Sequence, residues 1–173
     1  MITNMSLFIP SFIFKKITFI SPKFLSENGI KALILDVDNT LTAHGSQELD
    51  EDVKMWLEGM KKENIALIIS SNNTKNRVLP FAQKIGLDFV SFSCKPMPQG
   101  LFRARKKLGV AKNEIALVGD QIFTDVLGAN LYGIKMLMVQ PMHKDIKPTI
   151  MLKRRLEKPF IDKYYKKGGK LYE

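Results

Sequence analysis

The sequence predicts an α/β protein with three Rossmann-like layers, in which helices cover both faces of a central parallel sheet. From residue 31 onward, short and almost unbroken apolar runs alternate with amphipathic segments, which is the rhythm of βαβ units. Continuous apolar runs are typical of parallel strands that are buried on both faces. With 173 residues, of which 45% are hydrophobic, the chain is long enough for one compact domain with a packed core.

The apolar runs predict about five strands, and the segments between them predict helices. Apolar residues recur at the i, i+3, i+4 and i+7 positions of one helix face from Val53 to Met60, and again from Val78 to Ile85. A third helix is expected to begin near Pro98 and to end at Gly109. In chain order, the predicted strands are residues 32–35, 65–69, 89–92, 115–118 and 134–139.

The two ends of the chain predict extensions of the same domain: an arm over residues 1–30 and a basic helical segment over residues 146–173, around a core over 31–145. The apolar stretch near the start is interrupted by Pro10 and is too short to span a bilayer. No secretory signal is evident, so a cytoplasmic protein is expected. The arm either packs on the domain, which we favour, or lies at a membrane surface.

In the last segment, Leu152, Leu156 and Phe160 predict an apolar helix side, and Pro159 is expected to kink or break the helix.

Charge and composition limit the kinds of site that the chain can build. There are 27 Lys and Arg against 17 Asp and Glu, a net charge of +10, and the excess is concentrated at the two ends. These basic ends could contact anionic lipid phosphates in a peripheral association with a membrane. The single cysteine, Cys94, excludes an internal disulfide and a multi-cysteine zinc site, and two histidines, His44 and His143, disfavour a His-rich metal site. A metal site built from oxygen ligands remains compatible with this composition.

Polar residues follow the predicted strands at the points where those strands end. In open α/β sheets the carboxyl ends of the strands form the edge where ligands bind, so side chains from four segments should converge there. Carboxylates, a hydroxyl and an ammonium group at one edge are the components of a phosphoryl-transfer site. The residues concerned are Asp36, Asp38 and Thr40 after the first strand, Ser71 and Asn72 after the second, Lys95 after the third, and Gly119, Asp120 and Asp125 after the fourth.

The chemistry of a phosphate ester explains these residue types. The ester is an anion, so an attacking carboxylate is repelled unless a cation lies between them, and Mg²⁺ held by oxygen ligands such as Asp36 and Asp120 suits this role. A carboxylate is also a competent nucleophile that forms an aspartyl-phosphate. Asp38 lies two residues further along an extended chain and could protonate the leaving alcohol and then deprotonate water. Ser71 and Lys95 can stabilise charge on the transferred group.

These residues resemble, in order, the four signature motifs of the haloacid dehalogenase (HAD) superfamily of phosphatases. The motifs are Asp36-Val37-Asp38-Asn39-Thr40, then Ser71, then Lys95, and then Gly119-Asp120 with Asp125. More narrowly, LDVDNTL, SNN, KP and GDQIFTDVLGAN resemble the YqeG family of HAD type IIIA phosphatases, which includes relatives of the mitochondrial phosphatidylglycerophosphate phosphatase. The resemblance spans residues 31–139, most of the chain.

The resemblance implies a role for each matching position. Asp36 is the implied nucleophile and a ligand of Mg²⁺, and Asp38 is the implied general acid and base, with its backbone carbonyl on the metal. Asp120 is the implied direct acidic ligand, and Asp125 is either a further ligand or a carboxylate behind the ligands. The remaining implied roles are phosphate binding by Ser71, Asn72 and Lys95, and support of the site by Thr40 and Gly119.

The spacing of the motifs predicts an open site. Asp36 and Ser71 are 35 positions apart, and Ser71 and Lys95 are 24 apart, so one helix and one strand fill each interval and no cap domain is inserted. An open site suits a large substrate or a membrane-bound head group. The favoured function is a Mg²⁺-dependent phosphatase, and the resemblance to the YqeG family implies phosphatidylglycerophosphate as its favoured substrate.

Three alternatives remain at this stage. The chain could be a phosphatase of a soluble or macromolecular phosphate, or a receiver-like signalling module with acids and a lysine around Mg²⁺. It could also be an RNA- or ribosome-associated binding protein with a HAD core. Nucleic-acid binding is disfavoured, though not excluded, because the sequence shows no aromatic stacking platform of the kind that single strands need.

Overall fold

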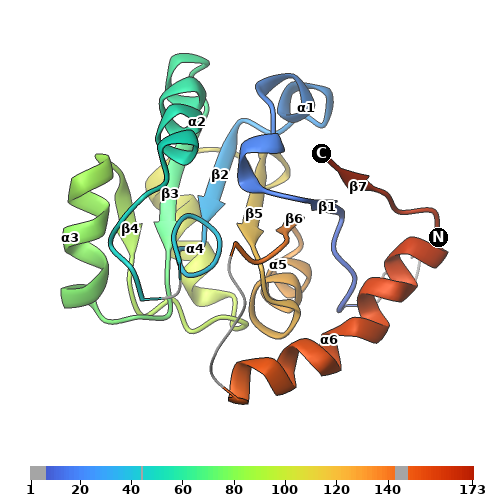
Figure 1. Ribbon diagram of the computed structural model, residues 1–173. Helices are drawn as coiled ribbons and strands as arrows, with labels where there is room; N and C mark the ends of the chain where they lie inside the picture. Colours follow the sequence, from blue (N-terminus) through green and yellow to red (C-terminus); the bar gives the residue numbers. More distant parts are fainter. Residues whose placement is uncertain (1–6, 44, 143–147) are drawn as a thin grey trace.

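Seven parallel strands form one sheet in the order β4-β3-β2-β5-β6-β1-β7 in the computed structural model (Figure 1). The structure describes residues 7–43, 45–142 and 148–173, so His44, His143 and the outer parts of both predicted extensions lie outside the described residues. The strands are β1 (Phe12–Phe14), β2 (Ala32–Leu35), β3 (Ala66–Ser70), β4 (Asp88–Val90), β5 (Ile115–Gly119), β6 (Lys135–Val139) and β7 (Leu171–Tyr172).

Helices lie on both faces of the sheet, which confirms the predicted three layers. One half of the core joins α1, α2 and α3 to one face, and the other half joins α4, α5, η3 and α6 to the opposite face. The helices are α1 (Pro22–Glu27), α2 (Glu51–Lys62), α3 (Lys75–Ile85), α4 (Gln99–Leu108), α5 (Leu127–Tyr132) and α6 (Pro148–Lys166), with the 3-10 turns η1 (Ile17–Phe19) and η2 (Lys112–Glu114) and the π-helical turn η3 (Ile122–Val126).

The alternation of side chains along each strand supplies both halves of the core. In β2, Leu33 and Leu35 pack with the helices of one face, whereas Ala32 and Ile34 pack with those of the other, because successive residues of a strand point to opposite sides. All four are fully buried. This is why the strand shows as a continuous apolar run in the sequence.

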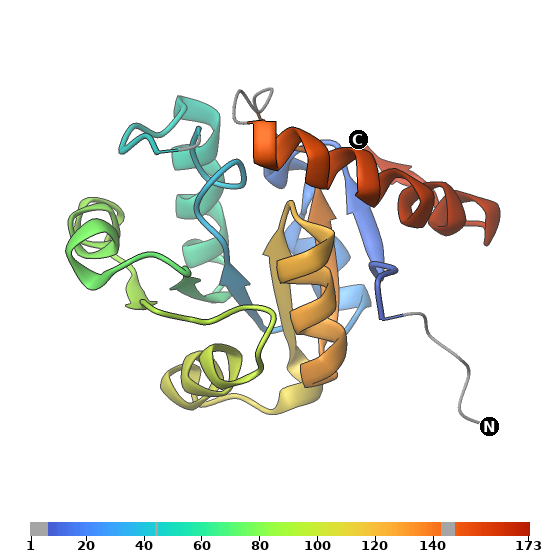
Figure 2. The same ribbon diagram turned by 90° about the horizontal axis from the view of Figure 1, so that it is seen from below.

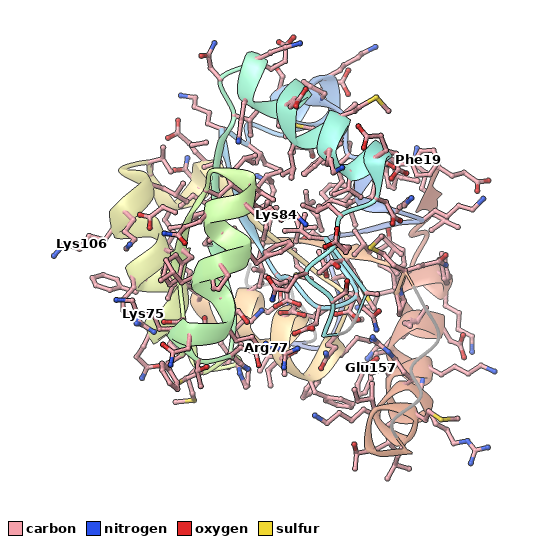
Figure 3. All side chains as sticks on the ribbon, turned by 60° about the vertical axis from the view of Figure 1, so that its left-hand side comes forward. Phe19, Lys75, Arg77, Lys84, Lys106 and Glu157 are labelled. Carbon is pink, nitrogen blue, oxygen red and sulfur yellow. The ribbon has the colours of Figure 1, made fainter. Side chains whose placement is uncertain are left out.

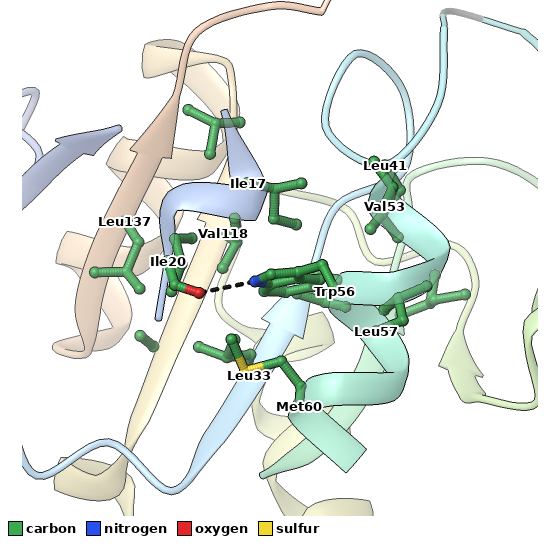
Figure 4. Packing of buried hydrophobic residues seen from close by; sticks show 14 of the residues in the cluster. Ile17, Ile20, Leu33, Leu41, Val53, Trp56, Leu57, Met60, Val118 and Leu137 are labelled. Carbon is green, nitrogen blue, oxygen red and sulfur yellow. Dashed lines mark hydrogen bonds between the residues drawn. The ribbon is translucent and has the colours of Figure 1, made fainter. Parts of the chain in front are cut away.

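Trp56 anchors α2 to the segment that follows β1. Its indole Nε1 donates a hydrogen bond of 2.7 Å to the carbonyl of Ile20, while its ring packs among the buried residues of the first half of the core (Figure 4). Val53, Leu57 and Met60 are buried on the same helix face, as the spacing of these residues predicts. The helix therefore ties the N-terminal part of the chain to the sheet.

The expected number of strands was too low, because β1 and β7 add to the five predicted ones. β1 has three residues and β7 has two, so neither is long enough to show a periodic pattern. β1 pairs with β6 on one side and with β7 on the other, so the two ends of the chain meet in the sheet. Ile13 and Phe14 of β1 are buried.

The last helix, α6, differs from its prediction in two respects. It is not broken at Pro159, where a kink or a break was expected, because this proline is exposed and the carbonyl it leaves unpaired, that of Arg155, belongs to another exposed residue. Its predicted apolar side was wrong for Leu152 and Leu156, which are exposed, whereas Phe160 packs against the core; the helix also buries Glu157 and Tyr164. None of the helices in the described parts of the chain combines the length and the apolarity that crossing a bilayer requires.

Candidate active site at the carboxyl edge of the sheet

The register of the central strands brings the predicted motifs to one level. Leu35 of β2 pairs with Ile69 of β3 and with Val118 of β5, so the residues that follow them leave the sheet side by side. Asp36 is held at this edge by its backbone N–H, which donates to the carbonyl of Val118 at 2.9 Å. Figure 2 looks onto this edge, with the loops that follow the strands in front.

Lys95 joins two carboxylates from different strands. Its Nζ lies 2.6 Å from Oδ1 of Asp36 and 2.7 Å from Oδ1 of Asp125, and the lysine side chain is only 2% exposed. Asp125 lies in η3, where its Oδ2 also accepts from the backbone N–H of Gln121 at 3.2 Å. One buried ammonium group therefore sets the distance between the carboxylate after β2 and the carboxylate after β5.

Asp120 completes a cluster of three acids. Oxygens of Asp36, Asp120 and Asp125 lie within 4.8 Å of one another. Asp120 is fully buried, and Arg154 of α6 donates to both its carbonyl oxygen, at 2.6 Å, and its carboxylate Oδ2. Its other oxygen, Oδ1, is buried and has no hydrogen-bond partner among the described residues. A buried carboxylate oxygen without a donor, beside two further carboxylates, fits a hard divalent cation with oxygen ligands.

The burial of these groups changes their protonation. Burial raises the pKa of Asp36 to about 7, with a further increase from the neighbouring Asp125, although the Lys95 ammonium opposes both. Burial likewise raises the pKa of Asp120 well above its ordinary value, and Arg154 only partly compensates. For Lys95, burial alone would lower the pKa, but the carboxylates of Asp125 and Asp36 outweigh it and raise the pKa above its usual value. A cation bound among these groups would thus favour the ionised forms of Asp36 and Asp120.

Comparison with known proteins shows to which family this geometry belongs. The family model for haloacid dehalogenase-like hydrolases matches residues 43–133, and the model for the mitochondrial PGP phosphatase matches residues 1–84. The probable phosphatase YqeG of Bacillus subtilis (strain 168) is 32% identical over 161 residues, which cover 93% of this chain and 94% of that protein. The chain belongs to the haloacid dehalogenase-like hydrolases. Within them its close match is to YqeG, and it is a HAD phosphatase.

A more distant relative matches nearly the whole chain, and two solved structures share its fold. Phosphatidylglycerophosphate phosphatase 1, chloroplastic/mitochondrial, of Arabidopsis thaliana is 24% identical over 94% of this chain, which spans only 49% of that relative's length. A 4-nitrophenylphosphatase from Thermotoga maritima has the same fold, with a TM-score of 0.57, 14% identity, and coverage of 69% of this chain and 89% of the other. An uncharacterized protein from Listeria monocytogenes serotype 4b has a TM-score of 0.54, 21% identity, and coverage of 69% and 85%.

The carboxylate of Asp38 lies outside the acidic cluster of this HAD phosphatase. Its Oδ2 accepts from Asn73 at 3.0 Å, and its Oδ1 accepts from the backbone N–H of Gly45 at 2.8 Å and from Arg77 at 3.3 Å. Figure 3 shows Arg77 at the end of α3 that lies beside this edge. The structure therefore brings Asp38 to the same edge as Asp36 but turns its side chain toward the start of α3.

Ser71 and Asn72 use their polar groups differently. The Ser71 hydroxyl accepts from the backbone N–H of Asn73 at 3.2 Å, which leaves its own proton available for donation. Asn72 binds the backbone of Lys95 twice: its Oδ1 accepts from the Lys95 N–H at 2.7 Å, and its Nδ2 donates to the Lys95 carbonyl at 3.0 Å. Asn72 thus positions Lys95. The hydroxyl of Ser70, the residue before Ser71, forms a hydrogen bond of 2.7 Å with the buried hydroxyl of Ser93.

Gly119 and Thr40, the two residues expected to support the site, differ in their contacts. Gly119 lies directly against Asp125, since a Cβ atom built on it would be 2.5 Å from Cγ of that residue. Only glycine allows the acid to approach so closely. Thr40 is buried, but its hydroxyl has no hydrogen-bond partner among the described residues. The turn after β2 is instead closed by backbone bonds, such as that from Asn39 N–H to Thr42 carbonyl at 2.7 Å.

Sequence reasoning missed two residues of this site, both on α6. Arg154 contacts Asp120, and Glu157, which is 1% exposed, accepts from Arg154 at 3.0 Å and from the backbone N–H of Ile122 at 2.7 Å. From the sequence, only a basic helical segment is predicted over these positions, and neither residue is given a role in the site. The helix period supplied a signal, because Glu157 shares one face with Phe160, Ile161 and Tyr164, which pack into the core.

Proposed function

We propose that this phosphatase is a Mg²⁺-dependent phosphomonoesterase that acts through an aspartyl-phosphate on Asp36, with phosphatidylglycerophosphate as the favoured substrate. The observation that carries the proposal is the buried cluster of Asp36, Asp120 and Asp125 around Lys95, with Oδ1 of Asp120 left without a donor. Asp36 and Asp120, with the Asp38 carbonyl, would hold the ion, and we assign Asp125 the role of fixing Lys95. Bound Mg²⁺ supplies positive charge between the phosphate and the attacking carboxylate.

Asp36 is the group best placed to attack phosphorus. One of its carboxylate oxygens is occupied by Lys95, while the other accepts no hydrogen bond from the described residues and can form the bond to phosphorus. The bond from phosphorus to the alcohol oxygen breaks, and the alcohol takes a proton from Asp38. A water molecule then attacks the phosphorus, gives its proton to Asp38 and releases phosphate and free Asp36.

Asp38 has to turn for this role. In the structure its carboxylate is bound by Asn73, Arg77 and the Gly45 N–H, so a rotation toward Asp36 would exchange these donors for the leaving oxygen. Such hydrogen bonds in free enzymes often rearrange when substrate binds. Ser71, with its proton available, and Lys95 would bind the oxygens of the transferred phosphoryl group.

The lipid substrate is supported by the surroundings of the site and by the relatives. Between β2 and β3 the described residues form a loop and α2, and between β3 and β4 they form a loop and α3, so in these parts no separate unit covers the site. A relative that matches 94% of this chain is named for phosphatidylglycerophosphate. An open site beside basic segments suits a phosphate at a membrane surface, with the core over residues 31–145 as the catalytic unit.

The test is phosphate release from phosphatidylglycerophosphate in detergent micelles, with Mg²⁺ and with EDTA. The wild type is expected to release phosphate only with the metal, and Asp36→Asn to release none while it keeps its circular dichroism spectrum and unfolds cooperatively. Asp88→Asn serves as the matched control, because Asp88 is an exposed acid paired with Lys107 on the surface. Near-normal turnover by Asp36→Asn would refute the mechanism, and hydrolysis of only an aryl phosphate would refute the lipid substrate.

A further inference from the structure

The outward face of α6 exposes a patch of large apolar side chains. Met151, Leu152 and Leu156 are 56%, 59% and 55% exposed, although they lie on a helix whose opposite side is buried in the core. Leu152 and Leu156 are one turn apart and lie on one side of the helix, and Met151 is exposed in the turn where Leu152 lies. An exposed apolar patch on a charged helix is a typical feature of a docking surface.

Basic side chains line a depression further along the same helix. The depression is shallow and is lined by Pro159 and Asp162 together with four cations. The four are Arg155, Lys158, Lys163 and Lys166, and none of them forms an ion pair with another described residue. We refer to this depression and the apolar patch together as the α6 outer face.

The basic residues at the other end of the chain are arranged differently. Lys15 is paired with Glu173 at 2.9 Å, and Lys16 is paired with Asp52. The positive charge of the N-terminal arm is therefore largely compensated, whereas that of the α6 outer face is opposed only by Asp162 on the same surface. Of the two basic ends, α6 carries the charge available to an anionic partner.

The position of α6 relates this face to the catalytic site. The helix runs along the lower right of the molecule in Figure 1, at the end toward which the arrows of β2, β3 and β5 point, and Figure 2 shows it to one side of the strands. Arg154, on its inner side, bonds to the carboxylate and the carbonyl of Asp120. A partner that binds the outer face of α6 would therefore contact the same helix that holds Asp120 of the acidic cluster.

We propose that the α6 outer face docks the enzyme on the surface of an anionic lipid bilayer, with Met151, Leu152 and Leu156 among the lipid chains and the four cations on the head-group phosphates. This inference rests on the proposed lipid substrate and adds the surface by which the enzyme reaches it. Apolar side chains beside lysines are the combination by which interfacial helices bind membranes. A nucleic acid would use the cations but would leave the three apolar side chains in water, so the lipid surface explains more of what the helix exposes.

Sedimentation with sucrose-loaded vesicles tests the docking surface separately from catalysis. The full-length protein is mixed with vesicles of phosphatidylcholine alone or with an equal part of phosphatidylglycerol. We expect binding to the anionic vesicles only, and a loss of about tenfold in the partition coefficient for Leu152→Ser/Leu156→Ser and for Lys158→Glu/Lys163→Glu. Hydrolysis of a soluble aryl phosphate by the leucine variant should remain as in the wild type, which shows that its fold and catalytic site are intact.

Matched controls lie on parts of the molecule far from α6. Met55→Ser removes a similarly exposed apolar side chain from α2, which lies at the opposite end of the view from α6 in Figure 1. Lys75→Glu/Lys106→Glu changes the net charge by the same amount as the α6 charge variant, and Figure 3 shows both lysines on the side away from Glu157 of α6. Both controls should bind anionic vesicles as the wild type does.

Four results would overturn the docking surface: no preference of the wild type for anionic vesicles, wild-type binding by both α6 variants, equal losses in the controls, or binding of an RNA oligonucleotide in place of vesicles. The substrate assignment is tested independently. Vesicle binding that depends on α6, without hydrolysis of phosphatidylglycerophosphate, would support the surface and refute the substrate. Hydrolysis in micelles without vesicle binding would refute the surface alone.

Discussion

Gly119 illustrates how a single residue controls the geometry of the site. The space for its missing side chain is filled by Asp125, whose Oδ1 fixes Lys95, which in turn contacts Asp36. A methyl group at this position would have to displace the carboxylate. The position of the lysine between two acids therefore depends on a residue that has no functional group of its own.

Gly119→Ala is expected to lower kcat on a soluble aryl phosphate by roughly a hundredfold, because a small displacement of Asp125 moves Lys95 away from its productive position. The unfolding free energy should fall by about 1–3 kcal/mol, as for an overpacked core. Gly59→Ala is the control, because a Cβ at Gly59 in α2 meets nothing within 4 Å. Steady-state kinetics and urea unfolding check both variants, and an unchanged kcat for Gly119→Ala would contradict the role given to Asp125.

Arg154 is the second residue whose removal should have a defined cost. Arg154→Met leaves the fully buried Asp120 carboxylate without its partner, so the metal-free protein should lose about 3 kcal/mol of stability. Adding Asp120→Asn to this variant removes the unpaired charge and should restore most of that loss. Urea unfolding in EDTA gives the unfolding free energies of the wild type, Arg154→Met, Asp120→Asn and the double variant. These four values form a double-mutant cycle. Independent, additive effects of the two substitutions would show that the pair does not interact.

At the scale of the elements, the two short strands β1 and β7 link the ends of the chain. Tyr172 of β7 packs against Phe12, Phe14 and Phe24, with ring centroids 4.9–5.8 Å apart. Phe24 belongs to α1, and Phe12 and Phe14 belong to β1, so this aromatic cluster connects three elements from opposite ends of the sequence. The cluster lies at the far edge of the sheet from β4.

Tyr172→Ala is therefore expected to destabilise the protein by about 2–3 kcal/mol without changing kcat on a soluble substrate, because the ring is only partly buried and lies outside the acidic cluster. Phe19→Ala, in the 3-10 turn η1, provides the comparison, since that ring is 44% exposed and should cost much less. Urea unfolding gives both values. Equal losses for the two variants would show that β7 does not stabilise the edge of the sheet.

For the whole molecule, the buried acids make stability depend on pH and on metal. The pKa of Asp36 in the folded protein, about 7, is above its ordinary value of 3.8, so the folded state holds this proton more tightly than the unfolded state does. The stabilisation that comes from the protonated Asp36 is complete below pH 4 and is lost as the pH rises toward 7. The ionised, metal-free site is thus the less stable form.

The melting temperature of the protein in EDTA should accordingly fall more between pH 5 and pH 8 in the wild type than in Asp36→Asn, which has no charge to bury at this position. At pH 8, added Mg²⁺ should raise the melting temperature of the wild type, because binding to the folded state alone stabilises it. Calorimetry at the two pH values checks both effects. The same decrease in wild type and variant would contradict the raised pKa of Asp36.

Much of the fold and of the site follows from local patterns in the sequence. The positions of the five central strands and of α2, α3 and α4 are set by runs and periods of apolar residues, and parallel strands bring their carboxyl ends to one edge. Asp36, Ser71, Lys95 and Asp120 could therefore be placed together from the sequence. Their roles followed from chemistry and from the resemblance to a family.

Other features depend on contacts between residues that are distant in the sequence, and only the tertiary structure decided them. β1 and β7 are too short to carry a pattern and exist because each completes the other's hydrogen bonds at the edge of the sheet. The orientation of α6 is set by Arg154 and Glu157, which bond to Asp120 and Ile122 more than 30 residues away and so turn Leu152 and Leu156 outward. Local periodicity determines where an element lies in the chain, but the face that it buries is determined by the partners that the whole fold brings to it.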